Sequence, residues 1–255
     1  MNIVKATFKF ILFALLTIPV VVLQVILMQF HKGKGAYILP YFWQKCVCKI
    51  FSIKVKIIGK PHTSSQTIYI SNHISYLDIP VIGSILPTSF VAKKDVASWP
   101  VFGFLSKLQQ TAFISRDRAD AIKGKQTLNA MLSQGKSLII FAEGTSTDGR
   151  EVLPFKSSLF AVALQENLPD LRVQSITLKM HTVNQKEIIT QDDRDLYSWH
   201  RDMDTPLGTH LWRFAKSRGA EIFLNFHPPV KAHDFSDRKT LAKACHNTVS
   251  NGLEE

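Results

Sequence analysis

The chain has 255 residues, 45% of them hydrophobic and 20% charged, and its 31 basic against 20 acidic residues give a net charge of +11 that indicates an anionic partner. Zinc-finger spacing, a basic leucine-zipper repeat and a single-strand-binding aromatic signature are all missing from the sequence, which argues against nucleic acid and for anionic membrane lipids. Three cysteines, with Cys46 and Cys48 interpreted as ordinary helix residues rather than metal ligands, argue against a disulfide scaffold or a zinc site.

Residues 10–30, FILFALLTIPVVVLQVILMQF, form an uncharged run that is long enough to cross a hydrocarbon core. The run is followed by the basic segment HKGK and not by a cleavage site, so we expect permanent membrane attachment rather than a signal peptide. Pro19 interrupts the backbone hydrogen bonds near the middle of the run, and lysines flank both of its ends. These features leave open whether the run spans the bilayer or lies in one leaflet.

Residues 40–51 place apolar and aromatic side chains beside Lys45 and Lys49, as a helix at a membrane interface does. Such a helix would form a hairpin with the run at residues 10–30, sunk in one leaflet. The alternative is that residues 40–51 pack on the globular part of the chain. We therefore divide the chain into a membrane segment, residues 1–52, and a globular domain, residues 53–255.

Beyond Gly59, short apolar runs alternate with helical patterns, which is typical of an α/β domain with a mixed, largely parallel sheet flanked by helices. Strands are predicted at residues 67–71, 89–92, 112–115, 137–141, 173–178 and 221–226. Helices are predicted at residues 118–134, 205–218 and 237–251. Cys245 shares one face of the last helix with Leu241 and Val249, so we expect it in the core.

The first block that carries chemistry is NHISYLD, residues 72–78, which directly follows a predicted strand, where α/β sheets place their sites. His73 and Asp78 bracket one tight turn in this block. A carboxylate on the far nitrogen holds an imidazole in one tautomer and makes it a better base for a substrate hydroxyl. Taken alone, a His-x4-Asp pair is more often a structural histidine at the start of a helix.

Two further strand ends run into polar turns. In the block FISRDR, Arg116 is suited to bind a phosphate through both of its terminal nitrogens, although a solvated Arg and Asp pair would produce the same pattern. In the block FAEGTSTDG, Gly144 lets backbone amides approach an oxyanion or a phosphate, and Glu143 can accept a hydrogen bond from a substrate hydroxyl. Lys156, in the following LPFK, adds a cation near the same strand end.

Together, NHISYLD, FISRDR and FAEGTSTDG followed by LPFK resemble the blocks of the glycerolipid acyltransferases typified by lysophosphatidic acid acyltransferase, over roughly residues 55–230. By this resemblance, His73 is the general base and Asp78 orients it. The Arg block and the Glu-Gly-Thr block hold the acceptor in that family. The substrate-binding residues that the resemblance implies are therefore Arg116, Glu143, Gly144, Thr145, Lys156 and Lys93. Lys93 matches a basic position between the first two blocks, and its alternative is a surface lysine.

The resemblance implies transfer of a fatty acyl group from acyl-CoA or acyl carrier protein to the free hydroxyl of a lysolipid, with no metal or redox cofactor and no covalent acyl-enzyme. Lysophosphatidic acid is the acceptor we expect, because Lys93, Arg116 and Lys156 would supply a positive pocket. Ser146, however, stands where many family members carry arginine, and residues 173–176 lack a usual proline. EGTSTDG, YSWHRD and FHPP look closer to bacterial enzymes that acylate lyso-ornithine lipid, which is the alternative acceptor.

Two other classes remain open from the sequence. One is a membrane-bound lipid-binding protein that keeps the fold without catalysis, and the other is a basic scaffold that charge holds on the membrane. The intact set of His73, Asp78, Arg116 and Glu143 argues against the lipid-binding protein. The scaffold predicts that changes at His73 have no effect. Because acyl thioesters are made in the cytosol, we expect a bacterial inner-membrane protein whose catalytic domain faces the cytoplasm.

Overall fold

The computed structural model describes residues 2–30, 33–115, 118–166 and 168–254. Its centre is an eight-stranded sheet in the order β1-β7-β6-β2-β5-β3-β4, with β8 paired to β6. The strands are β1 (Ile53–Gly59), β2 (Thr67–Ser71), β3 (Ser89–Lys93), β4 (Ala112–Ile114), β5 (Leu138–Phe141), β6 (Arg172–Val183), β7 (Ala220–Phe226) and β8 (Val230–Lys231).

Helices and short 3₁₀ turns connect these strands. The α-helices are α1 (Asn2–Phe30), α2 (Ile38–Ile50), α3 (Asp78–Gly83), α4 (Phe102–Leu108), α5 (Arg118–Ser133), α6 (Gln191–Arg194), α7 (Leu207–Lys216) and α8 (Arg238–Glu254). The 3₁₀ turns are η1 (Lys34–Tyr37), η2 (Lys94–Ser98), η3 (Ser157–Val162) and η4 (Ala232–Asp234).

The sheet is mixed and largely parallel, as the sequence predicts. Strand β2 runs parallel to β5 and β6, and β3 runs parallel to β5 and β4. Strand β7 pairs with β1 in parallel and with β6 in antiparallel orientation, and β8 is antiparallel to β6. Because β2, β5, β3 and β4 all point the same way, their carboxyl ends meet at one edge of the sheet.

Apolar side chains cover both faces of the sheet. Since side chains alternate along a strand, Tyr69 of β2 joins one core cluster while its neighbours Ile68 and Ile70 join the other. Helices α2, α3 and α7 contribute to the first cluster, and α5 and α8 contribute to the second. Cys245 of α8 is 3% exposed within the second cluster, which confirms its expected place in the core.

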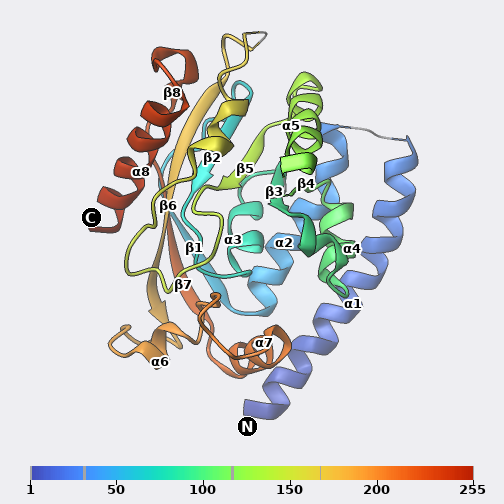
Figure 1. Cartoon of the computed structure of the whole chain (residues 1–255). Coiled ribbons are helices and arrows are strands. Elements are labelled where there is room, and N and C mark those ends of the chain that lie inside the picture. Colours follow the sequence, from blue (N-terminus) through green and yellow to red (C-terminus); the bar gives the residue numbers. More distant parts are fainter. Residues whose placement is uncertain (1, 31–32, 116–117, 167, 255) are drawn as a thin grey trace.

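Helix α1 is the one helix within the described ranges that is long and apolar enough to cross a membrane. Its 29 residues continue through Pro19 as one helix, although the proline has no N–H to donate to the preceding turn. Figure 1 shows α1 along the outer edge of the molecule, on the side opposite α8. It packs against α2, α4 and α7 rather than standing apart from the domain.

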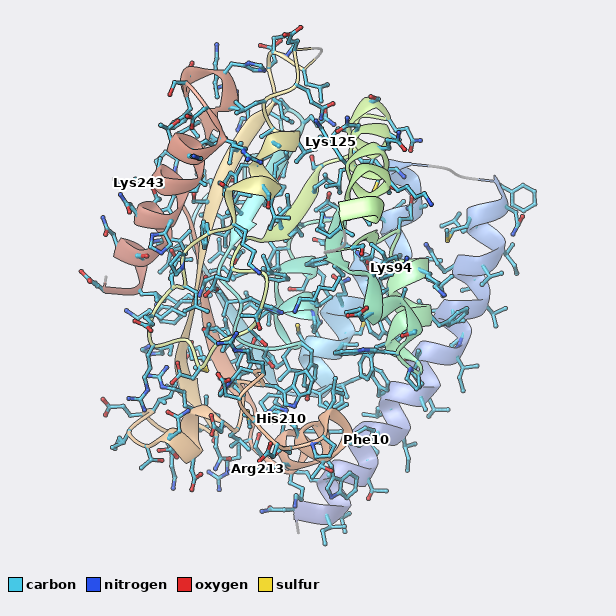
Figure 2. All side chains as sticks on the ribbon, viewed as in Figure 1. Phe10, Lys94, Lys125, His210, Arg213 and Lys243 are labelled. Atoms are coloured by element: carbon cyan, nitrogen blue, oxygen red, sulfur yellow. The ribbon has the colours of Figure 1, made fainter. Side chains whose placement is uncertain are left out.

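Polar side chains of α1 bond to the rest of the chain. Gln24 donates to the carbonyl oxygens of Ala36 and Leu108 at 2.8 and 3.0 Å. Lys9 donates to the Ser217 carbonyl at the end of α7, 3.2 Å away. The next residue, Phe10, packs on Trp212 of α7, near His210 and Arg213 at the lower end of Figure 2. The outer face of α1 keeps large apolar side chains exposed, among them Ile11, Leu15, Ile18, Val22 and Ile26.

Helix α2 includes residues 40–50 of the segment 40–51, for which the sequence left open whether it packs on the globular part of the chain. Pro40, Gln44 and Val47 are buried, and α2 packs on α1, α3 and β1, so the helix is docked on the domain. Ile38 and Phe42 remain exposed on its other side. Thus α1 and α2 form a helical hairpin with one face on the domain and an apolar outer face.

Candidate active site

His73 and Asp78 form a hydrogen-bonded pair, called the dyad below, where the chain turns from β2 into α3. The Nδ1 of His73 and Oδ2 of Asp78 lie 2.9 Å apart. The Asp78 side chain is fully buried, whereas the His73 side chain keeps 21% of its surface exposed. A carboxylate is an acceptor only, so Nδ1 carries the proton and Nε2 is the nitrogen free to accept one.

Asp78 is held by donors on both of its oxygens. Its Oδ2 also accepts the backbone N–H groups of Ile74 and Ser75 at 2.7 and 2.9 Å. Its Oδ1 accepts the hydroxyl of Tyr197 at 2.9 Å. A buried carboxylate is costly unless donors satisfy it, so these bonds allow Asp78 to stay charged and fixed in orientation.

Glu143, two residues beyond the end of β5, braces the turn that carries His73. Its Oε1 accepts the backbone N–H of His73 at 2.7 Å and its Oε2 accepts that of Leu153 at 2.8 Å. Desolvation raises the pKa of this carboxyl to about 7, against the opposing effect of these two bonds. Glu143 is predicted from the sequence to accept a bond from a substrate hydroxyl; in the structure its side chain is 2% exposed and both oxygens accept backbone N–H groups.

The glycine turn after β5 has a lysine side chain packed against it. Gly144 has a φ of +69°, which a residue with a side chain adopts only at a cost. A Cβ at this position would lie 2.7 Å from Nζ of Lys156, so the lysine side chain passes directly over the glycine. Thr145 follows the glycine and is partly exposed. Farther along the turn, the N–H of Thr147 donates to the His73 carbonyl at 2.9 Å.

Aromatic packing sets the plane of the His73 ring. The imidazole stacks on Phe141, the last residue of β5, with ring centroids 4.0 Å apart and planes inclined by 18°. Phe90 of β3 stacks behind Phe141 at 6.2 Å. Parallel stacking of this kind limits rotation of the imidazole about its side-chain bonds. Nothing in the sequence alone indicates this role for Phe141.

The predicted site residues come from neighbouring strands. Ser71 at the end of β2 pairs with Phe141 at the end of β5, which places the first and third blocks side by side. Lys93 ends β3, next to β5, and pairs with Ile114, where β4 ends. The structure therefore gathers the ends of these four strands at one edge. Arg116 lies outside the described residues.

An aromatic group surrounds Tyr76, which lies within the turn of the dyad. Its hydroxyl and Nδ1 of His210 lie 2.9 Å apart, and Trp199 and Phe102 pack on its ring at 5.8 and 6.2 Å. His210 is fully buried, and desolvation lowers its pKa. The group thus links the dyad turn to α4 and α7.

Comparison with known proteins adds independent information. A family model described as "Acyltransferase" matches residues 52–178. A lyso-ornithine lipid O-acyltransferase of Rhodobacter capsulatus is 35% identical over 227 residues, which are 88% of this chain and 78% of that protein. A 1-acyl-sn-glycerol-3-phosphate acyltransferase of Neisseria gonorrhoeae is 29% identical over 190 residues, 74% of this chain and 70% of that protein.

The fold has a counterpart among solved structures. The 1-acyl-sn-glycerophosphate (LPA) acyltransferase PlsC of Thermotoga maritima superposes with a TM-score of 0.69 at 18% sequence identity. The superposition covers 100% of this chain and 97% of that one, so it includes the N-terminal helices as well as the sheet.

Proposed function

The chain belongs to the acyltransferase family, and from this membership we propose that it transfers a fatty acyl group from a thioester to the free hydroxyl of a lysolipid. The observation that carries the proposal is the dyad itself, with a buried Asp78 on Nδ1 and a partly exposed ring. This arrangement suits a base for a hydroxyl proton. The acyl donor is acyl-CoA or an acyl carrier protein.

The reaction proceeds by direct transfer. As the lysolipid hydroxyl attacks the thioester carbonyl, Nε2 of His73 takes its proton, and the Asp78 carboxylate stabilises the imidazolium that forms. The carbonyl oxygen becomes an oxyanion, which backbone N–H groups of the turns stabilise. Collapse of this intermediate breaks the C–S bond, and the departing sulfur receives the proton from His73. The products are the acylated lipid and a free thiol, and the two substrates suffice without a metal or redox cofactor.

Lyso-ornithine lipid is the acceptor we propose first. Identity over most of the chain is higher to the lyso-ornithine lipid enzyme, 35%, than to the glycerol-phosphate enzyme, 29%. Ser146 removes the cation that many relatives place after Glu-Gly-Thr, and a zwitterionic head group needs that charge less than a phosphate does. From the sequence we expect lysophosphatidic acid first; the two identities are our reason for proposing lyso-ornithine lipid ahead of it.

Lysophosphatidic acid remains the second candidate because two cations lie at the edge of the sheet where the carboxyl ends of β2, β5, β3 and β4 meet. Lys93 ends β3, and Lys156 passes over Gly144 beside the dyad turn. Arg116, two residues beyond the end of β4, stays a predicted contact for the acceptor. A phosphate would gain from such charges through charge-assisted hydrogen bonds.

A lipid-binding protein without catalysis explains the site less well. Fold and lipid binding do not require a buried carboxylate on His73, nor a second buried carboxyl, Glu143, that bonds the backbone of that same histidine. Buried carboxyl groups cost stability, so their concentration around one partly exposed imidazole favours a catalytic role.

We place the protein on the bacterial inner membrane with the site facing the cytoplasm, where acyl thioesters are made. Support comes from the apolar outer face of the α1–α2 hairpin and from a cleft of about 800 Å³ beside the start of α1. The described lining of this cleft has no acidic residue and includes Lys5, Lys186, Lys216 and Arg218. Such a surface attracts anionic head groups next to an inserted apolar helix.

A competition assay tests the transfer and the acceptor together. The purified protein receives lyso-ornithine lipid and lysophosphatidic acid at equal concentration with one acyl thioester, and the products are analysed by mass. The proposal predicts ornithine lipid as the main product. If phosphatidic acid is the main product, the order of the two acceptors is reversed. If neither acyl donor gives acylated lipid and free thiol, acyl transfer is contradicted.

A further inference from the structure

The dyad uses only one of the two oxygens of Asp78. His73, Ile74 and Ser75 all donate to Oδ2. The other oxygen, Oδ1, accepts the Tyr197 hydroxyl at 2.9 Å. We propose that Tyr197 is a positioning residue that sets the proton affinity of His73 through Asp78, an inference that rests on the proposed acyl transfer.

Tyr197 is rigidly placed for this role. Its side chain is fully buried, and its ring meets Phe214 of α7 edge-on, with centroids 6.0 Å apart. Desolvation, and then the negative charge of Asp78, raise the pKa of Tyr197 well above the ordinary value. The hydroxyl therefore keeps its proton and acts as the donor in this bond.

The segment that carries Tyr197 is tied to both turns of the site. The N–H of Trp199 donates to the Ile74 carbonyl at 3.0 Å, and Nη1 of Arg194 donates to the Asp148 carbonyl at 3.2 Å. This segment lies beyond residues 52–178, the part that matches the family model. A donor to the dyad thus comes from a part of the chain that the family match does not include.

A hydroxyl bond withdraws charge from the carboxylate that accepts it. Without the Tyr197 bond, the full charge of Asp78 would act on the His73 ring and would stabilise the imidazolium. The base would then become protonated at a higher pH and lose activity on the acid side. Oδ1 would also be left buried without its donor, so the carboxylate would be less firmly oriented.

Other titratable groups also face this pair. Glu143 lies behind the His73 turn, and Tyr76 and Cys48 interact electrostatically with Tyr197. Burial raises the pKa values of all three, with that of Glu143 at about 7, inside the range of an activity profile. A readout specific to the His73 ring is therefore needed.

The first test is Tyr197→Phe, which removes the hydroxyl and keeps the ring on Phe214. We expect kcat to fall about tenfold and the acid limb of kcat/KM to move up by about half to one pH unit, while KM for both substrates changes little. The matched control is Tyr69→Phe, since Tyr69 is also buried and donates its hydroxyl to the His62 carbonyl at 2.6 Å, away from Asp78. A wild-type pH profile in Tyr197→Phe, or a loss of activity without a pH shift, would overturn the proposal.

The second test reads the His73 ring without turnover, by ¹³C NMR titration of labelled histidine, with the signal assigned from its absence in His73→Ala. The titration should move up in Tyr197→Phe and stay in place in Tyr69→Phe. Replacing Tyr197 with 3-fluorotyrosine keeps the hydroxyl and makes it a stronger donor, so the His73 titration should move to lower pH. If Tyr197→Phe does not fold, the 3-fluorotyrosine variant provides the test. An active wild type with an unmoved ring titration would overturn the role of Tyr197 alone, whereas an inactive wild type would overturn the proposed function.

Discussion

His73 and Glu143 are joined across two neighbouring strands, because the backbone N–H of His73 donates to Oε1 of Glu143 at 2.7 Å. The other carboxyl oxygen holds Leu153 in the same way. One buried carboxyl therefore fixes the end of β2, which carries the dyad, against the end of β5 and the LPFK segment.

Glu143→Gln should weaken this connection. The amide places an N–H₂ group against a backbone N–H donor, so one buried bond is lost, with a cost of about 1–3 kcal/mol in the free energy of unfolding. Activity should fall as well, since the His73 turn loses its anchor. Thermal unfolding and turnover are compared with Glu151→Gln, a matched change at an exposed position. Equal stability and turnover in both variants would show that the brace is unimportant.

The raised pKa of Glu143 makes that stability difference depend on pH. The folded protein holds the Glu143 proton up to about pH 7, while the unfolded chain releases it near the ordinary value of 4.5. Because the folded state binds more protons in this window, the contribution of Glu143 is full below it and decreases as the pH rises through it. The gap in unfolding free energy between wild type and Glu143→Gln should therefore narrow from pH 5 to pH 7.5. Chemical denaturation at both pH values measures this difference in unfolding free energy. A difference that widens from pH 5 to pH 7.5 would contradict the raised pKa of Glu143.

The outer face of α1 should hold the protein on the membrane without contributing to the fold. Leu15 and Ile18 are both 65% exposed, so changing both to Glu should release the protein from membranes in a carbonate wash while its melting temperature stays near wild type. Ile189→Glu, at an apolar position that is 80% exposed in another part of the chain, is the control and should remain in the pellet. Retention of the α1 variant in the pellet would assign the attachment to another surface.

The basic cleft beside α1 should recognise anionic lipid. Changing Lys5 and Lys186 to Glu should weaken binding to vesicles that contain phosphatidylglycerol by at least about tenfold, since each lysine near an anionic surface contributes about 1 kcal/mol. The control changes Lys239 and Lys243 on α8, across the molecule from α1 in Figure 1. Sedimentation with neutral and anionic vesicles measures the effect, and equal loss in both double variants would point to net charge alone.

Local patterns predicted much of the fold and part of the site. The strand before His73 is predicted at its observed bounds, residues 67–71, because four of its five residues are β-branched or aromatic. Strand β1 was missed, since it lies at the sheet edge with mostly exposed side chains and follows directly on the apolar N-terminal segment. The spacing of His73 and Asp78 was a local signal, and the two residues do meet.

Contacts between distant residues gave no such signal. Tyr197 lies 119 positions from Asp78, and only the packing of the segment after α6 brings its hydroxyl to the carboxylate. For Glu143, the sequence predicts a contact with a substrate hydroxyl, but it cannot show that backbone N–H groups bond to both carboxyl oxygens. Gln24 lies within the uncharged run of residues 10–30, and nothing local in the sequence shows that it donates to the carbonyls of Ala36 and Leu108.

The central claim is that His73 removes the proton from the acceptor hydroxyl, and thiol release from an acyl thioester tests it most directly. Purified wild type and His73→Ala are assayed with saturating lysolipid, and binding of the lysolipid is measured separately for both. Because general-base assistance contributes about 10²- to 10⁴-fold, His73→Ala should lose at least about a hundredfold in kcat while it still binds the lipid. Turnover of His73→Ala close to that of the wild type would contradict the account.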